Sequence, residues 1–176
     1  ANLVPWQQAA RRCGARLRIL LPDGQGRLHV EDLARLLTPL TRVFAVTACA
    51  NATGERPPFE AMLALAAEAG ALTVLDAAQS VGKLPVSVDA LGADLLTMAG
   101  HKFSAPKGIG ALYVRTGTPL RSILHGADQE QGLRPGTENV ALIVALGAAA
   151  ALASAELPAL TDRLRALRER LHARLA

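Results

Sequence analysis

Two ionisable residues follow apolar runs that are typical of buried strands. Asp76 ends the run LTVL, and Lys102 follows the run LLTMAGH 26 positions later. That separation is about one strand–helix–strand step, so the two side chains are expected on neighbouring or near-neighbouring strands. A partly desolvated amine can attack an aldehyde, and a carboxylate can keep a ring nitrogen protonated. Taken alone, the pair is explained more simply by a salt bridge that closes a sheet edge.

One cofactor chemistry uses both groups, and it is that of pyridoxal phosphate. The lysine bonds the cofactor aldehyde, and the acid pairs with the pyridinium nitrogen so that the ring can accept electrons. The Gly/Pro-rich loop SAPKGIG, which follows Lys102, gives the amine a setting in which it can be desolvated. Lys107, inside that loop, is the competing amine, and we expect it to be exposed or near the phosphate.

Composition bounds the class of protein. The chain has 176 residues, of which 51% are hydrophobic, and this suffices for one domain with a sizeable core. The net charge of +4 is spread among acidic residues, as in DRLRALRERLHARLA, and no basic run is interleaved with aromatic residues. Nucleic acid is therefore not expected as a direct partner.

The cysteines and the apolar runs indicate the compartment. Cys13 and Cys49 form no CxxC or zinc-type spacing, which favours free thiols and a cytoplasmic location. No signal peptide is recognised at the start of the sequence. The longest apolar run, Val140–Ala155, is shorter than a membrane span, so we expect a buried helix and no membrane partner.

Strand and helix patterns alternate along the chain and predict an α/β fold. Several strands are apolar on both faces, which is typical of a mostly parallel sheet with helices on both faces. The expected strands are 16–21, 42–50, 71–76, 94–99 and 109–115. The expected helices are 30–37, 59–70, a turn at 89–91, and 139 to the end, broken or kinked near Pro158. Ligands of such sheets bind beyond the carboxyl ends of the strands. The polar residues at those ends are Asn51, Asp76, Gln79, His101 and Lys102.

Three segments carry specific motifs. They are Asp76–Arg115, with DAAQ, GHK and PKGIG; His125–Ala149, with RPGTEN; and the opening Ala1–Ala15. Together they closely resemble the cysteine desulfurases, which are class V aminotransferase-like enzymes dependent on pyridoxal phosphate. The resemblance covers nearly the whole chain. It implies the central part of the large domain of a fold-type I pyridoxal-phosphate enzyme, the aspartate-aminotransferase fold.

The resemblance also implies a role for each matching residue. Lys102 would be the Schiff-base lysine and the catalytic base, and Asp76 would pair with the pyridinium nitrogen. His101 would help to hold the phosphate. Gln79 would hydrogen-bond the ring hydroxyl oxygen, and Asn51 would lie close to the same edge of the ring. Thr137 would reach the phosphate of the partner subunit, because these enzymes are homodimers with shared sites.

Each assignment has a plainer alternative. Gln79 could cap a helix after the strand, and Asn51 could only set a turn with Gly54. His101 and Thr137 could be ordinary loop residues. These alternatives are acceptable one by one, whereas the ordered set favours the site.

The sequence departs from the family in length and in detail. We expect residues 1–150 to form the cofactor-binding large domain, incomplete at its N-terminus, and 151–176 to begin a helical connection to a missing small domain. The ring-stacking histidine, an upstream phosphate loop and the persulfide cysteine of the family have no counterpart here. Ala99 stands where a phosphate-binding serine is common. Exposed apolar patches and self-association are expected to follow.

The function implied by the resemblance is sulfur mobilisation. L-cysteine would be converted to L-alanine, with the sulfur passed to an acceptor such as an iron–sulfur scaffold protein or towards thionucleosides. Two alternatives stay open. One is a truncated, non-catalytic remnant that at most binds the cofactor or a partner subunit. The other is a selenocysteine lyase or another class V lyase.

Overall fold

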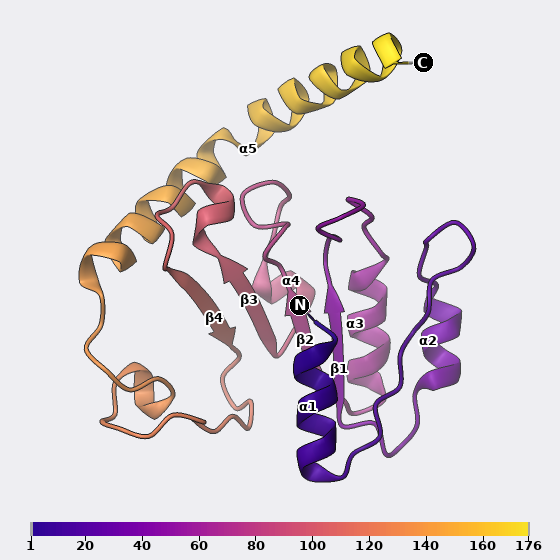
Figure 1. The fold of residues 1–176 in the computed structure, drawn as a ribbon, viewed down its shortest axis with the longest axis vertical. Helices are drawn as coiled ribbons and strands as arrows, with labels where there is room; N and C mark the ends of the chain where they lie inside the picture. Colours follow the sequence, from indigo (N-terminus) through magenta and orange to yellow (C-terminus); the bar gives the residue numbers. More distant parts are fainter. Residues whose placement is uncertain (1, 176) are drawn as a thin grey trace.

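A four-stranded sheet organises the protein, whose computed structural model describes residues 2–175 (Figure 1). Its strands are β1 (Val43–Thr47), β2 (Leu72–Asp76), β3 (Leu95–Ala99) and β4 (Gly110–Val114), in that spatial order. β1, β2 and β3 are parallel, and β4 runs antiparallel to β3. The predicted α/β fold with a mostly parallel sheet is confirmed.

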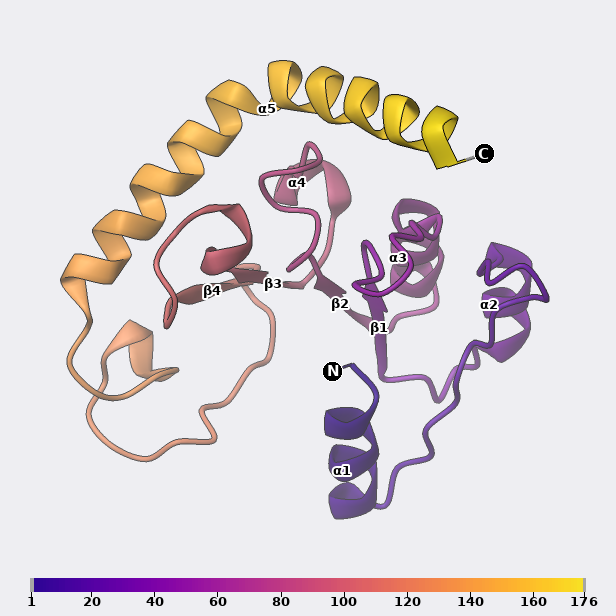
Figure 2. The same cartoon turned by 45° about the horizontal axis from the view of Figure 1, so that its top comes forward.

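Helices cover the two faces of this sheet unequally. They are α1 (Val4–Cys13), α2 (Val30–Leu36), α3 (Phe59–Glu68), α4 (Val88–Leu91) and α5 (Val140–Leu175), with short 3₁₀ turns η1 (Gly100–Phe103) and η2 (Glu130–Gly132). Figure 2 shows α1 on one face and α3, α4 and α5 on the other. Of the α-helices within residues 2–175, α1 alone lies on the face that carries the N-terminal segment.

The core lies between α3 and the centre of the sheet. Apolar residues at helical spacing place Met62 and Ala66 of α3 on the covered side, where both are fully buried. Met62 belongs to one core cluster with Leu75 of β2 and Leu96 of β3, which are also fully buried. The helix begins after Pro57 and Pro58, as expected of prolines that cannot donate to a helical ladder.

One predicted strand is wrong. Residues 16–21 form no strand in the structure and no backbone–backbone hydrogen bond with any described residue. The sequence alternates apolar residues at Leu17, Ile19 and Leu21, yet these side chains are exposed, as are Arg16 and Arg18 between them. A strand also needs a pairing partner, and none of the described strands lies beside this segment.

The expectation of a buried C-terminal helix is also wrong. α5 is 36 residues long and only Ala149 is buried, since the helix packs chiefly on Phe103 and Ala105 near η1. It continues through Pro158 and is bent, not broken (Figure 2). It also crosses the expected domain boundary at residue 150 without interruption, and that division stays a prediction.

The length of α5 corrects the expectation that the longest apolar segment is shorter than a membrane span. One window of 18 residues has a mean hydropathy of 2.1, so the helix is long and apolar enough to cross a membrane. The core helix of a soluble protein passes the same criterion, so this is weak evidence for a membrane. The predicted exposed apolar surface is confirmed on this helix, for example at Val144 and Leu152.

Gly82 is the residue that lets the turn after β2 approach η1. Its φ is +76°, and a Cβ at this position would lie 2.5 Å from Cβ of Phe103. We expect Gly82→Ala to lower the free energy of unfolding by ~1–3 kcal/mol, because Phe103 is buried and has to shift. Urea unfolding measures the change. Gly117→Ala is the matched control, since Gly117 also has positive φ but has open space around it; an equal loss in both variants would show that strain alone is responsible.

The turn before α2 contains an exposed ion pair. Asp23 accepts hydrogen bonds from the backbone of Arg27 and Gln25 and lies 2.9 Å from Nε2 of His29. The bonds from Arg27 and His29 lower the pKa of Asp23 to about 2, and Asp23 raises the pKa of His29.

A pH titration tests this pair. The stabilisation by His29 is complete below its ordinary pKa of 6.5 and is lost as pH rises through the raised value. That of Asp23 is complete above 3.8 and is lost as pH falls towards about 2. We therefore expect the imidazole NMR titration of His29 to move to lower pH in Asp23→Asn. An unchanged midpoint would show that the pair does not form in solution.

Candidate active site

The carboxyl ends of the three parallel strands meet at one edge of the sheet. In the strand register Asp76 of β2 lies beside Thr47 of β1 on one side and Thr97 of β3 on the other. Each neighbouring strand thus has a threonine at the level of the carboxylate, and a threonine hydroxyl can donate a hydrogen bond. This edge is where the sequence predicted a ligand site.

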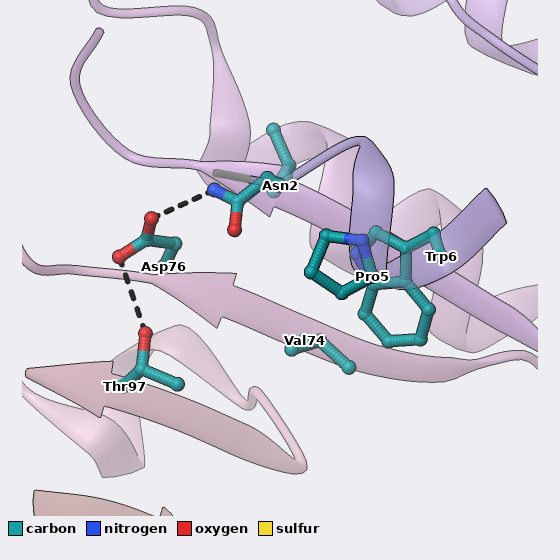
Figure 3. A pocket seen from close by; sticks show the side chains of 8 residues that line it. Asn2, Pro5, Trp6, Val74, Asp76 and Thr97 are labelled. Atoms are coloured by element: carbon teal, nitrogen blue, oxygen red, sulfur yellow. Dashed lines mark hydrogen bonds between the residues drawn. The ribbon is translucent and has the colours of Figure 1, made fainter. Parts of the chain in front are cut away.

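Donors on both sides hold the Asp76 carboxylate. Oδ1 accepts the backbone N–H of Ala78 at 2.9 Å and the Thr97 hydroxyl at 3.1 Å. Oδ2 accepts the side-chain amide of Asn2 at 2.7 Å (Figure 3). The same amide donates to the Thr47 hydroxyl. These hydrogen bonds fix the orientation of the Asp76 carboxylate. A carboxylate that pairs with a ring nitrogen requires such a fixed orientation.

Asn2 and Thr97 are site residues that the sequence analysis missed. Thr97 could have been found, since it is the one polar side chain in the run LLTMA and has the register position of Asp76. Asn2 gives no such signal. Its partner is 74 positions away, and only the path of α1 across the sheet brings them together.

A small cavity adjoins the carboxylate. Its volume is about 140 Å³, and it lies between the start of α1 and strands β1 to β3. Pro5, Trp6 and Val74 form its apolar wall, while Asn2 and Asp76 form its polar end (Figure 3). Trp6 is the single tryptophan of the chain, so its fluorescence reports on this place.

Asn51 and Gln79 form a pair of side-chain amides at the same edge. The amide of Gln79 donates to Oδ1 of Asn51, and Lys83 Nζ donates to Oε1 of Gln79 at 3.2 Å. Asn51 follows β1 and Gln79 follows β2, so strand pairing brings them together. No helix directly follows β2, which excludes the helix-capping alternative for Gln79. Asn51 does more than set a turn, because its side chain binds Gln79.

Lys102 lies on η1, directly after β3. Gly100 at the start of this turn packs so closely that an added Cβ would lie 2.9 Å from the Ile109 carbonyl oxygen. Phe103 at its end is buried. The turn is thus held at both ends, and Lys102 between them is half-buried. No salt bridge among residues 2–175 includes Lys102, so the simpler interpretation as an ion pair with Asp76 is wrong in this structure.

The other predicted residues are less closely joined. His101 is exposed on η1 beside Lys102, and Lys107 is exposed in the following loop, as expected. Thr137 is exposed in the loop between η2 and α5, and no hydrogen bond joins it to another candidate residue within the described chain. Its expected role at a partner subunit stays a prediction.

The residues at this edge fit pyridoxal phosphate in chemical type. A carboxylate held by three donors suits a pyridinium nitrogen, and paired amides suit the ring oxygen. A half-buried amine without an ion-pair partner suits a covalent bond to an aldehyde. Among residues 2–175, no three His, Cys, Asp or Glu side chains are grouped so that they could hold a metal ion.

Comparison with known proteins supports the same chemistry. The family model described as aminotransferase class-V matches residues 1–176. A cysteine desulfurase of Gluconacetobacter diazotrophicus is 44% identical over 169 residues, which are 96% of this chain and 42% of that protein. The chain thus spans about two fifths of the length of this curated relative.

Solved structures agree with this assignment. A NifS-like protein superposes with a TM-score of 0.93 at 31% identity, over 98% of this chain and 48% of that one. SspA in complex with cysteine superposes with a TM-score of 0.79 at 35% identity, over 84% and 43% of the two chains. Nearly all of the backbone that carries the sheet edge is therefore shared with the NifS-like protein.

Proposed function

Because the chain belongs to the aminotransferase class-V family, within which it matches the cysteine desulfurases, we propose that it forms the cofactor-binding core of such an enzyme. The cofactor is pyridoxal phosphate and the substrate is L-cysteine. The observation that carries this proposal is the orientation of Asp76 by Asn2, Thr97 and Ala78, at the sheet edge that leads to Lys102.

Different residues would hold different parts of the cofactor. Bound pyridoxal phosphate supplies an electron-accepting ring, which stabilises the carbanion left when an amino acid loses its α-proton. Asp76 would face the ring nitrogen, and the pair of Asn51 and Gln79 would face the ring oxygen. His101 would contact the phosphate from η1, and Thr137 would contact that of a partner subunit.

Lys102 would have two roles. Its Nζ is the group that would hold the cofactor by its aldehyde, and as a free amine it would take the proton from Cα of L-cysteine. The tight packing of Gly100 and Phe103 keeps the lysine at one place beyond β3. A general base needs such fixed reach to the proton that it removes.

The sulfur step needs a thiolate at the substrate, and neither Cys13 nor Cys49 lines the cavity beside Asp76. We therefore expect no alanine release from L-cysteine by this chain alone. The acceptor would be a protein such as an iron–sulfur scaffold, and the assembled enzyme would be a cytoplasmic homodimer.

Absorbance and fluorescence together test the proposal. Adding pyridoxal phosphate to the purified chain should produce a visible band that borohydride removes, and should quench Trp6 beside Asp76. L-cysteine should then change the band, whereas L-alanine should change it less. L-selenocysteine is the comparison for the lyase alternative. A folded chain that gives neither the band nor quenching would favour the non-catalytic alternative.

A further inference from the structure

Lys83 is a charged residue at the site edge that has no role in the proposed function. Its side chain is exposed, and Nζ donates to the side-chain oxygen Oε1 of Gln79 at 3.2 Å and to the carbonyl oxygen of the same residue at 3.4 Å. None of the salt bridges within residues 2–175 includes Lys83. Its ammonium group thus lies against an amide of the site and not against a carboxylate.

The turn after β2 places Lys83 beside Gln79. In this turn the backbone N–H of Leu84 donates to the Ser80 carbonyl oxygen at 2.8 Å, which is the i to i+4 pattern of a helical turn. Residues four apart in such a turn lie on the same side. Lys83 comes four residues after Gln79, so the path of the backbone brings its amine to the amide.

The positive charge of Lys83 determines the direction of the amide pair. An ammonium group can only donate hydrogen bonds, whereas an amide both donates and accepts them. Gln79 therefore turns its oxygen towards Lys83, and its N–H2 group donates to Oδ1 of Asn51. The reverse order, with Asn51 as the donor, has nearly the same shape but would bring the N–H2 group of Gln79 against a positive charge.

The direction of the pair decides which polar groups stay free at the edge of the sheet. The side-chain oxygens of Gln79 and Asn51 each accept a hydrogen bond already. The N–H2 group of Asn51 and the second N–H of Gln79 donate to no group within the described part of the chain. The free groups are thus donors, which suit an oxygen that carries negative charge. In the reverse order the oxygen of Asn51 would be free instead and would repel such an atom.

We propose that Lys83 is a positioning residue for the ring oxygen of pyridoxal phosphate. It fixes the direction of the amide pair, so that Asn51 and Gln79 present N–H groups to that oxygen and favour its anionic form. Lys83 acts through Gln79 and not by contact with the cofactor. This inference rests on the proposed function, in which the amide pair faces the ring oxygen.

Side-chain amide NMR tests the direction of the pair without any cofactor. In Lys83→Met the Gln79 amide loses the charge that orients it, so its protons should exchange with water about threefold faster or more. Lys83→Arg should keep the parental rate, because a guanidinium group also only donates. The side-chain amide of Asn139, whose oxygen accepts the backbone N–H of Leu142, is the internal reference and should not change.

The pH dependence of the visible band tests the effect on the cofactor. Donors and a nearby positive charge favour the deprotonated ring oxygen, so their loss should raise the pH midpoint of the band. Because Lys83 is exposed, we expect a rise on the order of half a pH unit in Lys83→Met and none in Lys83→Arg. The other titratable groups of the adjoining segments are the same in all variants; they are Glu55, Asp76, His101 and Lys102.

Two more variants separate the direction of the pair from general charge. In Lys83→Glu a carboxylate that only accepts should reverse the pair, and the midpoint should rise further than in Lys83→Met. Arg12→Met is the matched control, because Arg12 is an exposed cation of α1 without a salt bridge within residues 2–175. It should leave both the amide exchange and the midpoint at their parental values.

The two measurements distinguish a failure of this inference from a failure of the proposed function. A band with a parental midpoint in Lys83→Met, together with parental exchange of the Gln79 amide, would overturn the role of Lys83 and leave the cofactor site intact. An equal shift in Arg12→Met, or a shift in Lys83→Arg as large as in Lys83→Met, would also overturn it. Exchange that responds to Lys83 in a chain without a band would establish the direction of the pair and contradict the proposed function.

Discussion

Lys102→Ala is expected to abolish the visible absorbance band that pyridoxal phosphate gives with the parent chain. The variant lacks the amine that bonds the aldehyde, and the remaining lysines of the chain are Lys83 and Lys107. Lys83 donates to Gln79, and Lys107 is exposed in the loop. Neither lies on the tightly packed turn η1, so neither is expected to substitute.

The control for this experiment is Lys107→Ala. It removes a lysine from the same Gly/Pro-rich loop and should keep the band, with borohydride fixing the cofactor as in the parent. Lys102 makes no salt bridge within residues 2–175, so its removal should leave the unfolding midpoint unchanged within error. A band that survives in Lys102→Ala and disappears in Lys107→Ala would reverse the assignment.

Asp76→Asn is expected to weaken the binding of pyridoxal phosphate by roughly 10- to 150-fold. The amide has nearly the same shape but lacks the charge that pairs with a protonated ring nitrogen. A hydrogen bond to a charged group contributes ~1.5–3 kcal/mol, and each ~1.4 kcal/mol is a factor of ten in affinity. Spectral titration gives the affinity, and the band position reports the protonation of the ring.

Two further variants show whether the charge or its orientation is responsible. Asn2→Ala and Thr97→Val each remove one donor to Asp76 and should weaken binding less than Asp76→Asn does. Asp89→Asn, a change at an exposed residue of α4, is the control for charge alone. Equal affinity of Asp76→Asn and the parent would show that Asp76 does not face the ring.

The sequence alone was sufficient to predict strands β1 to β4, because each is a short apolar run bounded by turn residues. It was also sufficient to place Asp76 at the end of β2 and Lys102 just after the adjoining strand β3, since parallel strands end at one edge. These are properties of local pattern and chain direction. They do not depend on which distant residues happen to meet.

The failures concern interactions between distant residues. Residues 16–21 have the alternation of a strand, but pairing depends on a neighbour that local pattern cannot supply. The first part of α5, residues 140–153, is apolar all round, and periodicity cannot tell which side of such a segment is covered. Asn2 was missed for the same reason, because its bond to Asp76 spans 74 positions.

The most direct test of the central claim is a peptide map of the parent chain after borohydride reduction with pyridoxal phosphate. The chain offers three lysines, at 83, 102 and 107. The account predicts that the reduced cofactor is found on Lys102, at one equivalent per chain. Labelling spread over the three lysines, or confined to Lys83 or Lys107, would contradict it.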